Sequence, residues 1–153
     1  MKNINIQINK EEIYNKIKDV EYQFKINEND RVTEYKFQVN NKLDTKQHNK
    51  VNSDLLKFMV VNQFKSFSFI TAQNPNYNIL INTELSNIKS NENLKNDLNE
   101  YKFFEAETIF DNKFDEIGFV VFDLPIHLLL ILKNKYTQNA VIFGNNKYIK
   151  LII

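Results

Sequence analysis

The sequence predicts an α+β fold, a single compact domain in which a mostly antiparallel sheet of about five to seven strands packs with three or four helices. Two observations carry this prediction. Segments that alternate apolar and polar residues follow one another closely along the chain, as the strands of antiparallel hairpins do. Other segments place apolar residues at the spacing of a helix. Because 42% of the 153 residues are hydrophobic, the chain can form a sizeable core, and a single domain over residues 1–153 is expected.

The N-terminal half predicts a helix, a hairpin, a loop and a second helix. Residues 11–20 have helical spacing of their apolar side chains. Residues 21–39 alternate apolar and polar side chains on both sides of a polar turn, which predicts two strands. Residues 40–52 are mostly polar and are expected to form a mobile loop. A helix that has Ser53 or Asp54 as its N-cap follows this loop.

The middle of the chain predicts a buried strand, a polar loop and a long helix. Residues 67–71 are mostly apolar, as in a strand that is covered on both faces, and the loop after them contains Pro75. Residues 83–101 have the spacing of a helix on an otherwise polar sequence. The apolar residues of this helix are Leu85, Ile88, Leu94 and Leu98.

The last third of the chain predicts two hairpins on either side of a helix. Residues 103–110 and 116–123 read as the strands of the first hairpin. A proline then suits the start of a helix over residues 126–136. Residues 139–144 and 147–153 predict a final hairpin, whose last strand could pair with a second copy of the chain if it lies at a sheet edge.

Composition excludes several classes of function. With 20 basic and 19 acidic residues, and Arg31 as the only arginine, the chain lacks the basic excess of a duplex nucleic-acid binder. It has no cysteine, so it can form no disulfide or thiolate metal site. His48 and His127 lie too far apart for metal-ligand spacing, and two glycines form no phosphate-binding loop. We therefore expect no cofactor and no metal.

The ends and apolar runs of the sequence predict a cytoplasmic protein. The first ten residues lack the apolar core of a signal peptide. The longest apolar run, residues 126–132, is much shorter than a membrane span, so no membrane partner is expected. The abundance of Asn, Lys and Ile indicates an AT-rich genome.

Four segments in the second half of the chain carry a family resemblance. They are ITAQNP at residues 70–75, the helix with Asn87, Asn91, Leu94 and Leu98, EIGFVV from Glu116, and YTQNAVIFG with Gln138 and Asn139. Their residues and order resemble the bacterial family called domain of unknown function 3293 over residues 67–144. The resemblance implies a site formed by these segments, and it implies no reaction.

Candidate ligand-binding residues are concentrated after the strand at residues 67–71. Thr71, Gln73 and Asn74 offer a hydroxyl and two amides, which can hydrogen-bond a ligand without carrying charge. Their alternative role is to cap the backbone of a structural loop. Asn87 and Asn91 share one face of the predicted helix, either as ligand contacts or as structural or solvated amides.

Three further residues at strand starts complete the candidate set. Glu116 could accept hydrogen bonds from a ligand or act as a general acid or base, and it is the one speculative catalytic residue. Its alternative is a strand-end carboxylate in water. Gln138 and Asn139 are candidate ligand contacts, and their alternative is a helix C-cap followed by a turn.

These residues lead to three hypotheses about function. The first is a small binding domain that recognises a small polar ligand or a peptide through its amides. The second is an enzyme that acts on a nucleotide-like or other small metabolite with Glu116 as general acid or base. The third is a protein-interaction regulator from a mobile element or defence locus, with an apolar patch at Ile79, Leu80 and Ile81. The expected partner is a small polar molecule or a protein, with the chain a monomer or homodimer.

Overall fold

The computed structural model of the chain describes residues 10–39, 52–73 and 84–153. Within these ranges the chain forms four helices and a sheet of seven strands. The helices are α1 (Lys10–Ile17), α2 (Ser53–Val61), α3 (Glu84–Asp97) and α4 (Ile126–Lys135). The strands are β1 (Glu21–Glu28), β2 (Arg31–Phe37), β3 (Ser66–Ile70), β4 (Phe103–Phe110), β5 (Lys113–Phe122), β6 (Val141–Asn145) and β7 (Ile149–Ile152).

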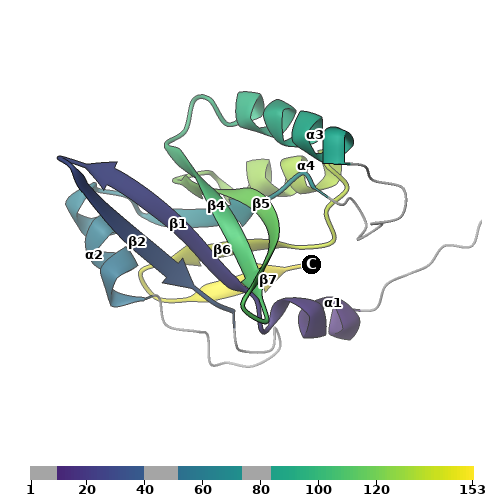
Figure 1. Ribbon diagram of the computed structural model, residues 1–153, viewed down its shortest axis with the longest axis horizontal. Helices are drawn as coiled ribbons and strands as arrows, with labels where there is room; N and C mark the ends of the chain where they lie inside the picture. The colour runs from purple at the N-terminus through teal and green to yellow at the C-terminus, as the bar shows by residue number, and fades with distance from the viewer. Residues whose placement is uncertain (1–9, 40–51, 74–83) are drawn as a thin grey trace, which may run out of the picture.

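The sheet has the strand order β2-β1-β4-β5-β3-β6-β7, and every pair of neighbours is antiparallel (Figure 1). Three hairpins, β1–β2, β4–β5 and β6–β7, supply six of these strands. The single strand β3 pairs with β5 on one side and β6 on the other, and so joins the second and third hairpins. The predicted α+β class with an antiparallel sheet is confirmed.

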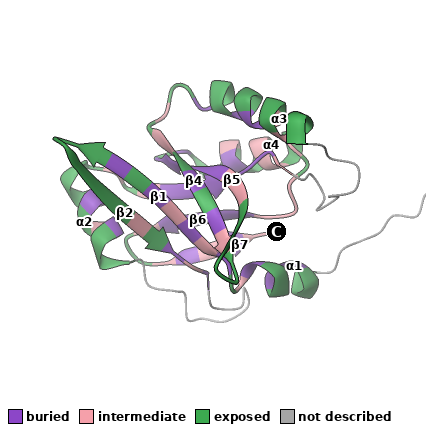
Figure 2. Cartoon of the chain, in the orientation of Figure 1, coloured by how far each residue is buried: buried purple, intermediate pink, exposed green. Residues whose placement is uncertain are grey.

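The sheet separates two apolar cores, and most of the buried residues lie on its strands (Figure 2). On one face, Ile13 of α1 and Leu55 of α2 belong to the same cluster as Phe67 of β3. On the other face, Leu94 of α3 packs in a cluster that includes Phe143 of β6. Because side chains alternate between the faces of a strand, the buried strands β3, β5 and β6 contribute to both cores. Helices α3 and α4 therefore cover the opposite face from α1 and α2 (Figure 1).

Two tight turns close the hairpins β1–β2 and β4–β5. Asn29 and Asp30 have φ of 50° and 63°, and Asp111 and Asn112 have φ of 52° and 58°. Two-residue hairpin turns that match the twist of the sheet need positive φ at both central positions, where Asn and Asp are tolerated. The predicted turn residues therefore form both hairpins without a glycine.

Both glycines of the chain lie in strands, where they make room for aromatic rings. A Cβ on Gly118 of β5 would lie 2.5 Å from the Phe69 ring and 2.8 Å from the carbonyl oxygen of Ile70. A Cβ on Gly144 of β6 would overlap the ring of Phe67 in the same way. Neither glycine has positive φ. The glycines are therefore required for packing, because β3 lays its phenylalanine rings over its neighbours.

The N-cap of helix α2 lies one residue before Ser53 and two before Asp54, the two predicted N-caps. Its N-cap is Asn52, whose Oδ1 accepts a hydrogen bond of 2.8 Å from the backbone N–H of Asp54. Asn is as good an N-cap residue as Ser or Asp, so the sequence did not distinguish them. Strand β5 also begins earlier than predicted, at Lys113, because the β4–β5 turn takes only two residues.

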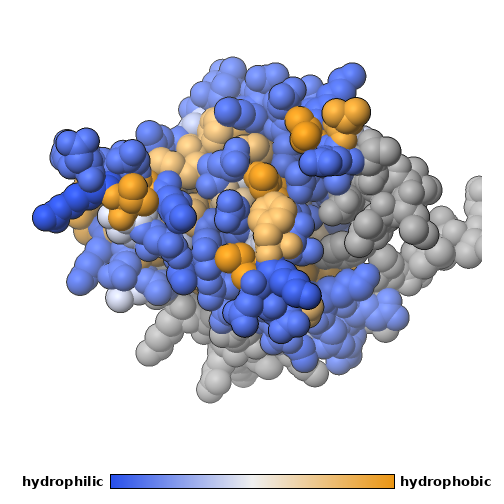
Figure 3. Space-filling model, in the orientation of Figure 1, coloured by the Kyte–Doolittle hydropathy of each residue, from blue (hydrophilic) through white to orange (hydrophobic). Residues whose placement is uncertain are grey.

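Helix α3 ends at Asp97, before the predicted end at residue 101, and the four predicted apolar positions divide into two pairs. Leu94 and Leu98 are fully buried, whereas Leu85 is 79% exposed and Ile88 is 47% exposed. The second half of the helix therefore packs on the sheet and the first half does not. On the face shown in Figure 3, which is mostly hydrophilic, the apolar side chains lie in separate small groups.

Some predictions concern residues outside the described ranges. They are the predictions for residues 40–51 of the polar loop, which include His48, and those for Asn74, Ile79, Leu80 and Ile81. The last predicted strand is β7. It forms one edge of the sheet, which is the position that pairing with a second copy of the chain requires. None of the described helices has the length and apolar composition needed to span a membrane.

Candidate functional site

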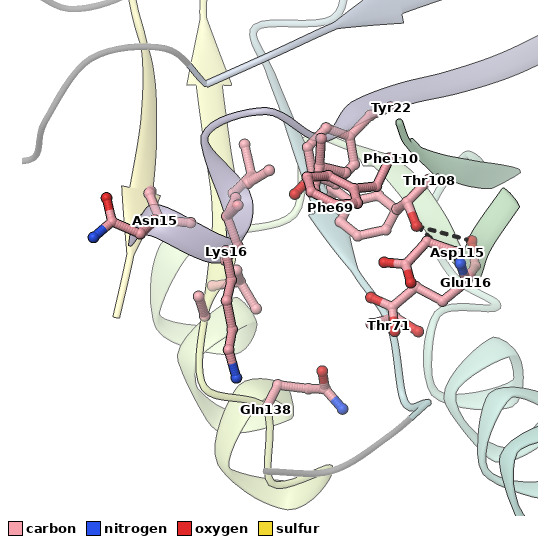
Figure 4. Close-up of a pocket in the computed structure, with 16 residues that line it drawn as sticks. Asn15, Lys16, Tyr22, Phe69, Thr71, Thr108, Phe110, Asp115, Glu116 and Gln138 are labelled. Atoms are coloured by element: carbon pink, nitrogen blue, oxygen red, sulfur yellow. Dashed lines mark hydrogen bonds between the residues drawn. The ribbon is translucent and has the colours of Figure 1, made fainter. Parts of the chain in front are cut away.

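A cavity of about 390 Å³ lies between α1 and the sheet. In this antiparallel sheet the strands β1, β5 and β6 begin at the same rim at which β3, β4 and β7 end, and the cavity opens along that rim. Its volume is within the range of about 300–1,000 Å³ that is usual for small-molecule sites. The side chains that line it and bear on function are Lys16, Tyr22, Phe69, Thr71, Thr108, Phe110, Asp115, Glu116 and Gln138 (Figure 4).

A β-bulge places two carboxylates in the cavity. Thr108 of β4 pairs with Glu116 of β5, but the next residue, Ile109, pairs with Phe114, so Asp115 has no partner on β4. Consecutive strand residues ordinarily point to opposite faces, and a bulge changes that direction locally. Asp115 and Glu116 therefore both line the same cavity.

The side chain of Thr108 holds this bulge in place. Its Oγ1 accepts a hydrogen bond of 3.0 Å from the backbone N–H of Glu116 and donates one of 3.2 Å to the carbonyl oxygen of the same residue. Thr108 is only 1% exposed, and buried hydroxyls need hydrogen-bond partners; the backbone of Glu116 on β5 supplies them. The dashed line in Figure 4 marks this contact beside Asp115.

The cavity has charged groups on opposite sides and an aromatic wall between them. Lys16 extends from α1 on the side away from Asp115 and Glu116 (Figure 4). Burial by the surrounding protein raises the pKa of the Asp115 carboxyl, although this residue also keeps a solvent-exposed surface. The rings of Tyr22 and Phe69 meet edge to face, with their centroids 4.6 Å apart.

Beside the cavity, side chains replace the hydrogen bonds of the sheet where β3 ends. The β3–β5 pairing stops at Ile70, so the N–H and C=O of Ile117 have no backbone partner on β3. The carbonyl of Ile117 accepts hydrogen bonds from Thr71 Oγ1 (2.7 Å) and from Asn91 Nδ2 (2.9 Å). Its N–H donates to Gln73 Oε1 at 2.9 Å. We call Thr71, Gln73 and Asn91 the rim brace.

The rim brace also fixes the start of the loop that follows β3. Asn91 Oδ1 accepts a hydrogen bond of 2.9 Å from the backbone N–H of Ala72, and Thr71 Oγ1 accepts one of 3.1 Å from Gln73. Asn91 comes from α3, on the other face of the sheet, so its amide is satisfied on both sides by backbone groups. The brace thus links α3 to the rim that forms the cavity.

The segment between α4 and β6 brings a further amide to the rim. Gln138 Nε2 donates to the carbonyl oxygen of Gln73 at 3.0 Å and to that of Tyr136 at 3.3 Å. Thr137 has φ of 52°, which is strained for a β-branched residue, and this turn aims Gln138 at the cavity. Asn139 lies outside the cavity lining, and its buried Nδ2 has no hydrogen-bond partner among the described residues.

The structure brings together most of the residues that the sequence singled out. Thr71, Glu116 and Gln138 line the cavity. Gln73 and Asn91 stand behind it in the rim brace, where their side chains hydrogen-bond backbone groups. The remaining candidates are apart from it: Asn87 is half-buried on α3, Asn139 is off the lining, and Asn74 lies outside the described residues.

Sequence reasoning missed the two charged residues Lys16 and Asp115. Lys16 is one of several lysines with no distinguishing spacing, and only the packing of α1 shows that it faces the cavity. The pair Asp115-Glu116 is visible as adjacent acidic residues, but alternation assigns them to opposite faces. Since the bulge depends on the pairing of two strands, no local signal could have placed both side chains together.

The described residues contain no group of three or more histidines or carboxylates that could hold a metal ion. A comparison of the chain with protein-family models, curated proteins and solved structures found no match. The resemblance to domain of unknown function 3293 therefore stays a prediction.

Proposed function

We propose that the protein is a small binding domain that holds a small polar ligand in the cavity between α1 and the sheet. The observation that carries this proposal is the convergence of Thr71, Glu116 and Gln138 on one cavity of about 390 Å³. These residues come from β3, β5 and the segment before β6, which are far apart in the sequence. A few polar groups around an apolar wall is the usual composition of a ligand site.

The hydrogen bonds around the cavity support a preformed site. Thr108 fixes the bulge from β4, and the rim brace fixes the end of β3. Side chains that are held before the ligand arrives lose little conformational freedom on binding, and this favours affinity. The volume suits a small molecule better than a peptide, which leaves the peptide as the weaker form of the proposal.

A second function, acid–base catalysis on a small metabolite, is favoured by one observation. Asp115 lies beside Glu116 in the cavity, and burial raises the pKa of the Asp115 carboxyl, as is common for general acids. A Glu116→Gln or Asp115→Asn change that abolished turnover while preserving ligand affinity would favour an enzyme. A variant that lost ligand affinity, in a protein without measurable turnover, would favour a binding domain.

A thermal-shift screen of purified protein tests the proposal. The compounds are nucleotides, amino acids, amines and small organic acids. A ligand at about 100 times its dissociation constant stabilises the fold by roughly 2.7 kcal/mol, and each kcal/mol raises the midpoint by about 2–4 °C. We expect at least one class of compound to stabilise the wild-type protein.

The matched variants for this screen are Glu116→Gln and Glu105→Gln. Glu105 lies on β4 and is exposed, and it does not line the cavity. The stabilisation should shrink in Glu116→Gln and persist in Glu105→Gln. A hit that both variants retain would place the binding site elsewhere, and a screen without any hit would refute a small-molecule function.

The setting of this function is also a proposal. We propose a bacterial protein that belongs with domain of unknown function 3293, on the strength of the four segments, and with that family a cytoplasmic location. A homodimer through β7 is compatible with its position at the sheet edge. A monomeric mass by light scattering at high concentration would contradict the dimer.

A further inference from the structure

We propose that the ligand of this cavity carries a protonated amine next to a flat apolar group, as an arylalkylamine does. This inference rests on the proposed function and specifies the chemistry of its ligand. It depends on three features of the cavity: the balance of charge, the aromatic wall and the position of Asp115.

The charged side chains of the cavity favour a cation. The charged residues that line it are Asp115, Glu116 and Lys16, so carboxylates exceed ammonium groups by two to one. The two carboxylates are adjacent, and Lys16 extends along the other side (Figure 4). A ligand ammonium between Asp115 and Glu116 would make charge-assisted hydrogen bonds, which are stronger than neutral ones. The competing ligand is an anion that binds to Lys16.

The wall between these charges is aromatic. Tyr22 and Phe69 are buried with their rings 4.6 Å apart, and Phe110 is 47% exposed at the same cavity. Aromatic faces attract cations and also pack against flat apolar groups. An amine with an aromatic ring can pack on the wall and hydrogen-bond the carboxylates together, whereas a purely polar cation such as a polyamine would gain only the second contact.

The position of Asp115 is the third feature. As the bulged residue of β5 it has no paired residue on β4, and its carboxylate forms no hydrogen bond or ion pair with another described residue. The protein partly desolvates its carboxyl without supplying an opposite charge, which is consistent with the raised pKa. A bound ammonium would supply that charge.

The experiment uses three probes that share a ring and a two-carbon chain, phenethylamine, 2-phenylethanol and 3-phenylpropionate. Their dissociation constants are measured by titration calorimetry or NMR at millimolar concentrations. We expect phenethylamine to bind at least tenfold more tightly than the alcohol and the acid, because it alone can donate charge-assisted hydrogen bonds to the two carboxylates, which would repel the acid.

Two variants of the β4–β5 hairpin distinguish the effect of a charge inside the cavity from the effect of the overall charge of the protein. Asp115→Asn removes a negative charge inside the cavity, and we expect it to weaken phenethylamine binding about tenfold. Asp111→Asn removes the same charge in the β4–β5 turn, outside the cavity lining, and should leave binding unchanged. If Asp115→Asn does not fold, Glu116→Gln measures the same contribution from the neighbouring carboxylate.

The outcomes distinguish this inference from the function on which it rests. Tighter binding of 3-phenylpropionate, or equal binding of all three probes, would overturn the amine and keep the binding function. Equal loss in Asp115→Asn and Asp111→Asn would also overturn it. If no probe binds while other compounds of the thermal-shift screen do, only the inference fails; if nothing binds in either experiment, both fail.

Discussion

At the scale of single residues, the side chain of Asn91 connects the fold to the site. Its amide accepts a hydrogen bond from the N–H of Ala72 and donates one to the carbonyl of Ile117, so from a helix on the other face it links the end of β3 to the middle of β5. It is 8% exposed, and water cannot readily replace these partners. Asn91 is therefore a positioning residue whose role in the site is indirect.

Replacing Asn91 by Ala should destabilise the protein by about 2–4 kcal/mol, because it leaves a buried N–H and a carbonyl without one of their partners. Urea denaturation measures the loss. The control is Asn93→Ala, an exposed position of the same helix, where Ala is the better helix former and stability should not fall. If the two variants have the same midpoint, the rim brace has no structural importance.

At the scale of elements, β3 is the strand on which the sheet depends. It joins two hairpins, and its rings of Phe67 and Phe69 lie over Gly144 and Gly118 of the neighbouring strands. The ring of Phe67 is fully buried and also packs edge to face on Phe37, with centroids 5.2 Å apart. The ring therefore cannot move aside without disturbing the core around it.

The change Gly144→Ala should destabilise the protein by about 1–3 kcal/mol, the usual effect of overpacking a core. The measurement is the midpoint of urea unfolding. Combining Gly144→Ala with Phe67→Leu tests the cause, since the smaller side chain makes room for the added methyl group. The double variant should then lose less than the sum of the two single losses. Additive losses would show that the ring and the glycine are not coupled.

Helices α3 and α4 are joined by a second interaction between elements. Asp97 Oδ2 accepts hydrogen bonds from Lys135 Nζ at 2.7 Å and from the Tyr136 hydroxyl at 2.5 Å. Partial burial acts to raise the pKa of Asp97, but these two hydrogen bonds outweigh burial and lower it below its ordinary value. Burial, with the hydrogen bond to Asp97, raises the pKa of Tyr136.

The contribution of Asp97 should depend on pH in a predictable direction. Its pKa is lower in the folded than in the unfolded chain, so the stabilisation is present above the unfolded pKa of about 4 and disappears as the pH falls through the folded pKa. The wild-type protein should therefore be more stable than Asp97→Asn at pH 7, and the difference should vanish in acid. Urea unfolding of both proteins from neutral pH to pH 3 measures it. A difference that stays constant would contradict the assignment.

At the scale of the whole molecule, the sequence predicted the helices and strands better than their arrangement in space. Period-two alternation identified the strands of the hairpins, and the turn residues Asn29-Asp30 and Asp111-Asn112 closed two of them. The strand order could not be predicted, because the pairing of β3 between β5 and β6 joins residues far apart in the sequence. The convergence of Thr71, Glu116 and Gln138 on one rim follows from that order.

The parts of the site that local patterns missed depend on contacts between elements. The bulge at Asp115 requires the register of β4 against β5, and the place of Lys16 requires the packing of α1 on the sheet. For two amide side chains, by contrast, the local pattern predicted a role in the site that their contacts do not match. Gln73 and Asn91 have a pattern that suggests ligand contacts, but the contacts they make in the structure are to backbone groups that lost their partners where β3 ends.

The most direct test of a ligand site at this rim is a chemical-shift map of backbone amides during titration with phenethylamine, or with the strongest hit of the thermal-shift screen. We predict that the largest shifts occur at Lys16, Asp115, Glu116 and Gln138, in segments that only the folded sheet brings together. The amides of β2 and of the exposed face of α3 should not move. Shifts confined to those elements, or spread evenly over the surface, would contradict the site.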